Sequence, residues 1–542
     1  MFKKFILPGI ISLAVGAVYF FFALPAVNIR YGGFWFMLLL MAIAYFAVYL
    51  KFSGRLGTVK IIGGKPQIKP GKRIRMAVLI VILVAVVALI AIFISSAKLF
   101  RAGDYQKMLT VSEGEFSQDI AELPFSQIPV VDRDTAARLG STKLGNVVEL
   151  VSQFDVSEYY TQINYKETPV RVSPLAYNGI LKWFANRSEG IPYYVMIDMA
   201  TQNTELVKLE AGMKYSPSEY LMRDLHRHVR FAYPTKMFYE TSFEIDDAGK
   251  PYWVLSYYEY TIGFLGGKDI KGIILVDAVT GEMKDYGISE VPSWIDRVYS
   301  ADLIIEQADN WGSLKNGYWN SVFTQKSVVQ TTSGYNYLAL NDDVWLYTGI
   351  TSVASDNSNI GFILINMRTK ESRTYAINGA SEYSAMDSAE GMIQEKGYKA
   401  TFPILVNVAD KPSYFISLKD NAGLVKAYSF VSVSNYQIVG VADTLEGAQK
   451  EYRRLLGVSD GENTNEPDNQ KPEQEILEIT GTVSRISSAV QDGNSVYYME
   501  INGEIYIAGI DVDMRLPLLR EGDELTVSYG KEEGMNRVKK IK

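Results

Sequence analysis

Cysteine is absent from this chain of 542 residues, and histidine occurs only twice. A protein without thiols forms no disulfide, no thiolate-bound metal site, no iron–sulfur cluster and no cysteine nucleophile. A chain of this length exceeds one compact core and is expected to divide into several domains. Those domains must be held by burial and hydrogen bonds alone. The composition is compatible with an exported bacterial protein.

Acidic residues are absent from residues 1–99, which contain 12 Lys and Arg; the first acidic residue is Asp104. The remaining 443 residues hold the other 42 basic residues and all 61 acidic ones, a net charge of −19. An acidic body argues against nucleic acid as a partner, because nucleic-acid binding needs a basic surface. It also argues against the body lying flat on anionic lipid.

Charged residues and histidine are also missing from three apolar runs within residues 1–99: Phe5–Val27, Phe34–Leu50 and Met76–Ile94. A bilayer core about 30 Å thick is crossed by roughly 20 apolar helical residues. The runs therefore predict a membrane anchor of three transmembrane helices, with the lipid bilayer as a partner. A transporter or channel formed by these helices alone is not favoured, because ion and proton pathways use ionisable groups within the membrane.

Basic residues in the short connections predict the orientation of the anchor. The loop 51–75 contains eight Lys and Arg, the amino terminus has Lys3 and Lys4, and the hairpin between the first two runs has only Arg30. Because cytoplasmic loops carry the excess of positive charge, the amino terminus and this loop are predicted to be cytoplasmic. Everything after Ile94 is then extracytoplasmic, which predicts a bacterial plasma-membrane protein with a large exported region.

A pattern of strand, polar turn and strand recurs through residues 100–456. Its copies are Tyr193–Lys208, Ile273–Ile288, Phe362–Ile377 and, more degenerate, Ser429–Val441. The turn residues Asp198, Asp277, Asn366 and Asn435 are 79, 89 and 69 positions apart. Similar order at similar spacing predicts related units over residues 150–211, 212–300, 301–380 and 381–456. A helix on an antiparallel sheet is the simplest packing for such a unit, so we expect an α+β body.

Local signals predict where helices and strands of these units begin. Ser216-Pro217-Ser218-Glu219 has the pattern of a capping box with proline at the first helical position, and predicts a helix through about Arg230. Ser384–Lys396 predicts a second helix that ends at Gly397. The segments starting at Lys250-Pro251 and at Lys411-Pro412 predict aromatic strands.

The segment Val276–Met283 resembles the last hairpin of PepSY-type domains, whose strands end in a D-A-x-T-G-E turn. The match lies at Asp277, Ala278, Thr280, Gly281 and Glu282, and the glycine is missing from 198–203 and 366–371. The resemblance implies small exported α+β modules linked to protease inhibition or regulation and to cell-envelope proteins, but it transfers no ligand site. The layout also resembles large bacterial membrane proteins. The candidate site positions at the repeat turns are Asp198, Asp277, Thr280, Gly281, Glu282 and Asn366.

For two polar regions, a metal site is the alternative to a purely structural role. Gly334–Gly361 contains Asp342, Asp343 and Asp356, but it lacks the tight alternation of oxygen ligands of calcium loops, so a polar connection between strands is favoured. His226 and His228 are two apart on a predicted helix and do not face each other. The arginines around these histidines favour a solvated basic helix face instead.

Aromatic residues are abundant, with 36 Tyr, 24 Phe and 7 Trp. Alternating strands with one aromatic face usually form a core, whereas an exposed Tyr and Trp platform for glycan or peptide is the alternative. Tyr252 and Trp253 are the candidate surface aromatic positions. No catalytic Ser, His and Asp arrangement, cofactor motif or metal motif is recognisable.

The last part of the chain has a different character. Residues 457–473 are polar and acidic without apolar periodicity, which predicts a disordered linker. Beyond it, five short strands separated by glycine-containing turns over residues 474–542 resemble a small OB-like barrel. No basic aromatic face supports nucleic-acid binding there, so a protein- or envelope-contacting module is expected.

These observations together predict a non-enzymatic, membrane-anchored cell-envelope protein that binds a protein partner or a wall polymer through its extracytoplasmic repeats. One alternative is an accessory subunit of a membrane transport or secretion complex. Another is an exported hydrolase with a carboxylate site, such as Asp277 with Glu282. A carboxyl group of strongly raised pKa in a cleft would favour the hydrolase.

Overall fold

The computed structural model describes residues 2–53, 60–62, 65–67, 72–352, 358–458, 477–491, 494–509, 512–513, 515–532 and 535–541. The chain forms two compact units, Met1–Asp460 and Gly461–Lys542. Residues 459–473 of the predicted linker lie outside the described residues, as do residues 54–59, 63–64 and 68–71 of the predicted basic loop.

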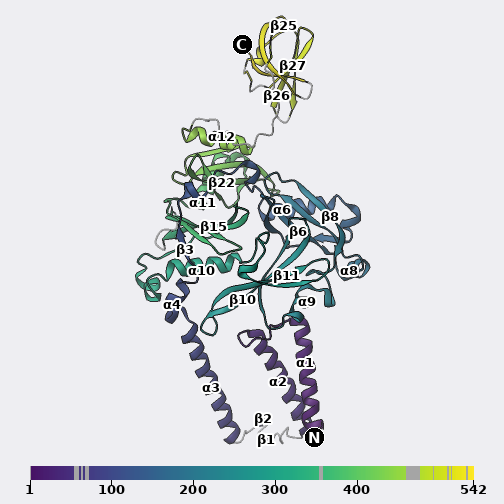
Figure 1. Cartoon of the computed structure of the whole chain (residues 1–542), viewed down its shortest axis with the longest axis vertical. Coiled ribbons are helices and arrows are strands. Elements are labelled where there is room, and N and C mark those ends of the chain that lie inside the picture. The colour runs from purple at the N-terminus through teal and green to yellow at the C-terminus, as the bar shows by residue number, and fades with distance from the viewer. Residues whose placement is uncertain are drawn as a thin grey trace. The chain divides into compact units, whose positions relative to one another are not determined.

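Three apolar helices begin the first unit (Figure 1). They are α1 (Leu7–Ala23), α2 (Gly32–Ser53) and α3 (Lys72–Ser96). Two helical stretches, Gly32–Phe52 and Leu83–Gln106, are long and apolar enough to cross a membrane. The 17 residues of α1 extend only about 25 Å at 1.5 Å per residue. This helix ends at Leu24, which adopts a left-handed conformation, because a residue before proline is disfavoured in a helix. The sequence predicted three spans, and two helices meet the length requirement.

Four sheets form the body, and each is built around four strands that pair antiparallel in chain order. The first is β5 (Thr161–Tyr165), β6 (Thr168–Tyr177), β7 (Ile191–Asp198) and β8 (Thr204–Met213). The second is β9 (Met237–Ile245), β10 (Pro251–Ile262), β11 (Gly266–Asp277) and β12 (Met283–Gly287). The third is β14 (Asn336–Leu340), β15 (Asp343–Ser352), β17 (Gly361–Asn366) and β18 (Ser372–Tyr375). The fourth is β21 (Ile404–Val408), β22 (Lys411–Lys419), β23 (Val425–Ser432) and β24 (Val439–Ala442).

Short strands extend these sheets at their edges. Three of them pair with the second strand of a sheet, beside the first: β4 (Phe154–Val156), β13 (Val329–Thr331) and β20 (Lys399–Ala400). A fourth, β3 (Val111–Glu113), pairs parallel to β18. The chain that follows the apolar helices thereby pairs with the third sheet.

Two central strands of the third sheet, β15 and β17, are buried on both faces. Every residue of β17 is buried, as are the first nine residues of β15. One continuous apolar cluster contains buried residues from all four sheets. The sheets therefore pack on each other as well as on their helices. This matches the α+β class predicted from the sequence.

Five of the helices that flank the sheets begin at a side chain that accepts a hydrogen bond from the backbone. They are α6 (Arg133–Gly145), α9 (Leu225–Ala232), α10 (Ala301–Ser313), α11 (Glu382–Met392) and α12 (Leu445–Leu455), capped by Asp132, Asp224, Ser300, Ser381 and Thr444. Such caps satisfy N–H groups that have no partner within the helix. The predicted end of the second helix is confirmed: a short 3₁₀ turn follows α11, and Gly397 closes it with φ of 63°.

The predicted capping box at residues 216–219 is wrong. The helix begins at Leu225, nine residues later, and Asp224 is its cap. Glu219 does not return to the backbone of Ser216, because its carboxylate is buried and accepts hydrogen bonds from Tyr177 and Trp183. The contact of Glu219 with Tyr177 and Trp183 therefore replaces the capping contact expected with Ser216.

The last unit is a closed five-stranded barrel. Its strands are β25 (Leu477–Gln491), β26 (Asn494–Ile501), β27 (Glu504–Gly509), β28 (Glu524–Glu532) and β29 (Met535–Ile541), in the order β25-β26-β27-β29-β28. An apolar cluster fills its interior, with Met499, Ile501, Tyr506 and Val527 fully buried. The five strands correspond to the five expected from the sequence.

The apolar helices and the body are joined by hydrogen bonds. The Oγ of Ser96, at the end of α3, accepts the backbone N–H groups of Phe264 and Leu265 at the tip of the β10–β11 hairpin, each at 3.0 Å. After α1, the N–H of Val27 donates to the carbonyl of Pro234 at 2.7 Å. The body is therefore attached to the apolar helices near the end of α3 and after α1.

Replacement of Ser96 by alanine tests this attachment. Ser96→Ala leaves two N–H groups without their acceptor, and an unsatisfied buried group costs about 1–3 kcal/mol. We expect faster proteolysis within the β10–β11 hairpin and a lower melting temperature of the full chain in detergent. Ser95→Ala is the control, because the Ser95 hydroxyl donates to Ile92 within its own helix. Equal behaviour of the two variants would contradict the attachment.

Candidate functional site

The repeat turns share one backbone geometry. The Oδ1 atoms of Asp198, Asp277 and Asn366 each accept the N–H groups two and three residues on, at 2.8–2.9 Å. The fourth residue after each has positive φ, whether it is Gln202 (63°), Gly281 (76°) or Lys370 (66°). Asn435 keeps only the bond to Gln437. The conformation therefore persists in the copies that lack the glycine.

Glycine is required in the second copy for a reason outside the turn. A Cβ at Gly281 would lie 2.4 Å from the ring of Tyr215, so no side chain fits there. The Gly281 carbonyl also lies 2.9 Å from the Nε2 atom of His228, whose ring packs on Tyr215. The Thr280 hydroxyl accepts the N–H of Glu282, as a turn hydroxyl does. These contacts are structural, and Glu282 is exposed.

The candidate positions at the turns do not converge. Asp198, Asp277 and Asn366 end β7, β11 and β17, which belong to three different sheets. Burial opposes ionisation of Asp277, but the Lys250 ammonium at 2.6 Å and the turn N–H groups outweigh it and lower the pKa of this carboxyl. A catalytic acid requires the opposite shift. The turns therefore form no shared site.

The surface platform at Tyr252 and Trp253 is also not formed. Trp253 is fully buried, donates from Nε1 to the carbonyl of Tyr215, and packs against Phe243. Tyr252 is half-buried and packs on Trp294, with ring centroids 5.2 Å apart. Trp253 is a core residue, because its strand has another element on each face.

The two histidines have separate protein neighbours: His228 Nε2 lies 2.9 Å from the Gly281 carbonyl, and His226 Nε2 lies 3.4 Å from the Thr241 hydroxyl. No group of three or more His, Asp and Glu suited to a metal ion occurs among the described residues. The predicted solvated basic face is wrong for Arg230, which is buried and donates to the carbonyls of Tyr233, Pro234 and Lys236. Burial lowers the pKa of His226, which favours its neutral form.

The polar stretch 334–361 is largely strand. Asp342 and Asp343 lie at the turn between β14 and β15, and Asp356 lies outside the described residues. Both carboxylate oxygens of Asp343 accept hydrogen bonds from Arg368 at 2.7 Å, and one also accepts from Asn366 at 2.8 Å. These contacts occupy Asp343 with protein partners.

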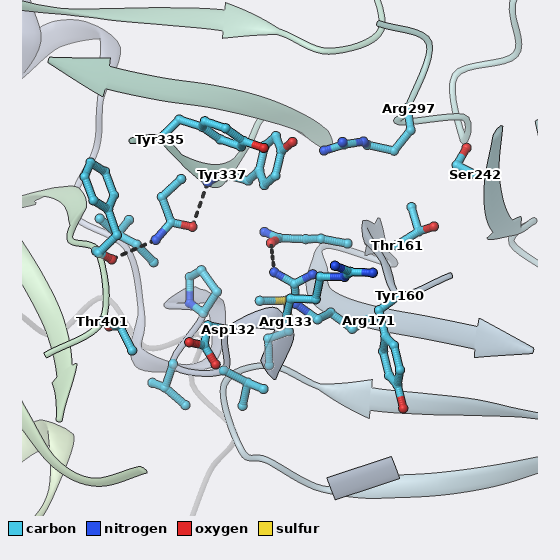
Figure 2. A pocket seen from close by; sticks show the side chains of 18 of the residues that line it. Asp132, Arg133, Tyr160, Thr161, Arg171, Ser242, Arg297, Tyr335, Tyr337 and Thr401 are labelled. Carbon is cyan, nitrogen blue, oxygen red and sulfur yellow. Dashed lines mark hydrogen bonds between the residues drawn. The ribbon is translucent and has the colours of Figure 1, made fainter. Parts of the chain in front are cut away.

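The site that the structure does form is a cavity of about 510 Å³ between the four sheets (Figure 2). The first strands of all four sheets contribute to its wall, as does the segment before α6. Its charged, amide and tyrosine side chains include Asp132, Arg133, Glu158, Gln162, Arg171, Glu240, Arg297, Tyr335 and Tyr337. A cavity of this size lies in the range of small-molecule sites.

Three arginines from separate parts of the chain line this cavity. Arg133 opens α6, Arg171 lies in β6, and Arg297 precedes α10. Figure 2 shows Arg133 and Arg171 close together and the Arg297 guanidinium directed toward Tyr337. The Arg297 guanidinium carbon is 4.2 Å from the Tyr337 ring centroid, a cation–π distance.

Carboxylates of the wall already have partners. Asp132 accepts hydrogen bonds from the Lys419 ammonium at 2.6 Å and from the N–H of Thr135. Burial opposes its ionisation, but these bonds prevail and lower the pKa of Asp132. Glu240 lies 3.9 Å from Arg297, and burial raises the pKa of this carboxyl.

Two buried carboxyl groups with raised pKa lie near the cavity. Burial is the main cause in both Glu244 and Asp296, and the charge of Glu244 further raises the pKa of Asp296. Neither residue lines the cavity, and each is at most 1% exposed. Glu244 accepts the N–H groups of Asp296 and Arg297, so it holds the chain before α10 in place. A substrate has no access to them.

The cavity was not identified from the sequence. Its lining residues are spread from Pro129 to Ser417, and no motif joins them. One signal was present: Arg171 interrupts the apolar run of a strand, between Val170 and Val172. A charged residue at such a position predicts either a partner or a site.

A pH-dependent stability is expected from the Asp277–Lys250 pair. Because the pKa of Asp277 is lower in the folded protein, the pair stabilises the fold above the unfolded pKa of about 3.9 and ceases to do so as the pH falls through the folded value. Asp277→Asn keeps the turn, as Asn366 shows, but removes the charge. We expect its melting temperature to be lower than that of the unmodified chain at pH 7, and the difference to shrink as the pH falls below the unfolded pKa of about 3.9.

Asp198→Asn is the control, because it makes the same change in a turn with no ion pair at that residue among the described side chains. Thermal unfolding between pH 7 and pH 3 measures both variants. A constant difference for Asp277→Asn across this range would contradict the role of the charge.

Comparisons with known proteins leave the chain without a family. No family model matches it, and no curated protein matches it. Among solved structures, the YpeB C-terminal domain of Bacillus megaterium is 11% identical and covers 45% of this chain and 98% of its own, with a TM-score of 0.10. An exo-1,5-α-L-arabinanase from a bovine ruminal metagenomic library is 10% identical and covers 71% of this chain and 98% of its own, with a TM-score of 0.17. Likenesses at such TM-scores carry no argument about function.

Proposed function

We propose that this is a non-enzymatic, membrane-anchored protein of the bacterial cell envelope, whose body binds a protein partner or a wall polymer in the cavity between its sheets. The observation that carries the proposal is the cavity itself, because all four sheets contribute to it and it combines guanidinium groups with tyrosine rings. Polar groups that converge on a largely preformed cavity are typical of binding sites.

The charge pattern of the first 99 residues supports the proposed location. Basic residues concentrate at the amino terminus and in loop 51–75, so both are cytoplasmic in this proposal and the body lies outside the plasma membrane. The shorter helix α1 crosses the membrane beside α2, to which it is bonded from the Ser12 hydroxyl to the Met41 carbonyl at 2.7 Å. Its short length is compensated by local thinning of the bilayer or by helix association.

Exposed aromatic side chains near the end of α3 also support this location. Trp319 and Phe323, in and beside η5 (Asn320–Thr324), are 61% and 73% exposed and stack on each other. The neighbouring Tyr318 packs on a cluster that contains Tyr105 of α4 (Lys98–Gln106), the helix that directly follows α3. Tryptophan is enriched at membrane interfaces. In the proposal, these rings contact the outer leaflet through apolar contact, which the acidic body does not oppose.

The four units are PepSY-like modules in this proposal, and the last domain is an OB-like barrel that contacts protein or envelope. The shared turn geometry of Asp198, Asp277 and Asn366 supports related units. The closed five-stranded barrel supports the second assignment. Repeated modules around one cavity favour binding over catalysis here, because the part that the units share is a structural turn.

The hydrolase alternative loses the residues that motivated it. Asp277 has a lowered pKa and Glu282 is exposed, whereas a general acid needs a raised pKa within a cleft. The accessory-subunit alternative retains one supporting observation, the short α1. A helix shorter than the bilayer core is stabilised by packing against other membrane helices, which a polytopic partner would supply.

Contact of Trp319 with lipid is testable by fluorescence quenching. The full chain is reconstituted in nanodiscs whose lipids carry bromine on the acyl chains. We expect these lipids to quench the unmodified chain more strongly than Trp319→Phe, because Trp319 lies at the lipid boundary. Trp294→Phe is the control, since Trp294 is packed on Tyr252 within the body. Equal quenching of the unmodified chain and Trp319→Phe would contradict the proposed contact.

Binding in the cavity is testable by capture from crosslinked native membranes. The bait proteins are the intact chain, an anchor-only chain that ends near residue 100, and two tyrosine variants. Tyr335 lines the cavity, whereas the similarly exposed Tyr436 lies before β24, so Tyr436→Ala is the matched control. We expect the intact chain and Tyr436→Ala to retain a partner that Tyr335→Ala retains at least about tenfold less, a loss of about 1.4 kcal/mol.

A partner that the anchor-only chain also retains would support the accessory-subunit alternative instead. A partner retained equally by Tyr335→Ala and Tyr436→Ala would contradict binding in the cavity.

A further inference from the structure

We propose that the cavity binds an oxyanion, a carboxylate or phosphate group of its ligand, and that Arg171 is the residue that binds it, with Arg133 and Arg297 beside it. The inference rests on the proposed binding function and adds the chemical class of the ligand. It commits to a negatively charged group that can accept two hydrogen bonds from one guanidinium.

Arg171 has an unusual environment for a buried arginine. It is 7% exposed, and its only hydrogen bond among the described residues runs from Nη2 to the Oε1 of Gln162 at 3.2 Å. Its Nε has no acceptor, and no carboxylate of the described residues lies within ion-pair distance of it. A buried charge is strongly destabilising unless it is paired and hydrogen-bonded. The free protein therefore carries a cost that an anionic ligand would remove.

Two other arginines, the half-buried Arg368 and the buried Arg230, have more protein acceptors than Arg171, although the Nε of Arg230 also lacks one. Arg368 makes two bonds to the carboxylate of Asp343, and Arg230 donates to three backbone carbonyls. Neither of these arginines lines the cavity. Arg171 is different, because its side chain lies in the cavity (Figure 2) and its donors are not consumed by the protein.

The surroundings of Arg171 contain two further arginines and one carboxylate that acts on it, Asp132, which already accepts hydrogen bonds from Lys419 and Thr135. The pKa of Arg171 is lowered to about 10, mainly by burial, and the like charges of Arg297 and Arg133 contribute to the shift. Arg133 donates to the backbone carbonyl of Glu158 at 2.8 Å, so that bond does not neutralise its charge. The wall of the cavity carries three arginines and three carboxylates, of which Asp132 is bonded to Lys419 and Glu240 lies 3.9 Å from Arg297.

Further groups complete a site for a ligand whose charged group is attached to a flat or apolar part. The Gln162 amide is 2% exposed, and its Nε2 has no acceptor, so it offers a second donor beside the guanidinium. The rings of Tyr335 and Tyr337 lie 5.6 Å apart on the opposite part of the wall (Figure 2). Charge-assisted bonds to a guanidinium are directional and strong, so the anion sets the ligand's orientation, and the tyrosines contact the remainder.

The experiment measures binding of defined probes to the full chain in nanodiscs by calorimetry and by the shift in melting temperature. The probes are inorganic phosphate, succinate and an N-acetylated amino acid, and the amino acid's methyl ester is the uncharged control. We expect one or more anions to bind and to raise the melting temperature, and the ester not to bind. Stronger binding of phosphate would assign a phosphoryl ligand, and stronger binding of the carboxylates would assign an acidic peptide end or sugar acid.

Arg171→Met separates a binding role from a structural one. We expect affinity for the anion to fall at least about thirtyfold, since truncating a buried hydrogen-bonded charge partner costs about 2 kcal/mol or more. We also expect the ligand-free variant to melt at the same temperature as the unmodified chain or higher, because an unpaired buried charge has been replaced by an apolar side chain of similar length.

Arg368→Met is the matched control, because it removes an arginine that has a carboxylate partner. It should lower the melting temperature and leave anion affinity unchanged. The inference is overturned if Arg171→Met melts lower and binds the anion as before, or if no anion binds. Failure of the anions together with the loss of a captured partner in Tyr335→Ala would leave the binding function standing and remove only the ligand class.

Discussion

The packing of four small sheets against each other is the constraint on which this structure depends. A single helix covers only one face of a four-stranded sheet. Here a neighbouring sheet packs on the other face. The continuous burial of β15 and β17 and the shared apolar cluster show this directly. Where the first strands of the four sheets approach each other, side chains do not fill the space, and the cavity results.

Buried polar groups divide into two classes in this protein. Most are neutralised or bonded by the protein: Asp343 by Arg368, Glu219 by Tyr177 and Trp183, and Glu244 by backbone N–H groups. These contacts fix the positions of turns and helix starts. Arg171 and Gln162 form the second class, because donors of both are directed to no acceptor. Single unpartnered donors also occur outside the cavity wall, at Arg230 and Trp345, but Arg171 and Gln162 lie together in the cavity and bond each other.

The sequence-based predictions were correct where a feature is determined by residues close to one another in the chain. The α+β class, the end of the helix at Gly397 and the turn bonds of Asp277 are set by neighbours in the chain, and the structure has them. The helix start at Ser216 and the surface position of Trp253 failed for one reason. In both cases a residue distant in sequence, Tyr177 for Glu219 or Tyr215 for Trp253, provides a partner that local pattern does not reveal.

The sequence by itself determined the apolar helices, the charge asymmetry, the repeating turns and the five strands of the last domain, because each of these is set by residues within about twenty positions of one another. Only the tertiary structure decided which polar residues are satisfied and which are not. Arg133, Arg171 and Arg297 come from a helix, a strand and a loop, and their proximity exists only once the sheets have packed. Burial and hydrogen bonding are properties of that packing, so the candidate site could not be derived from the chain alone.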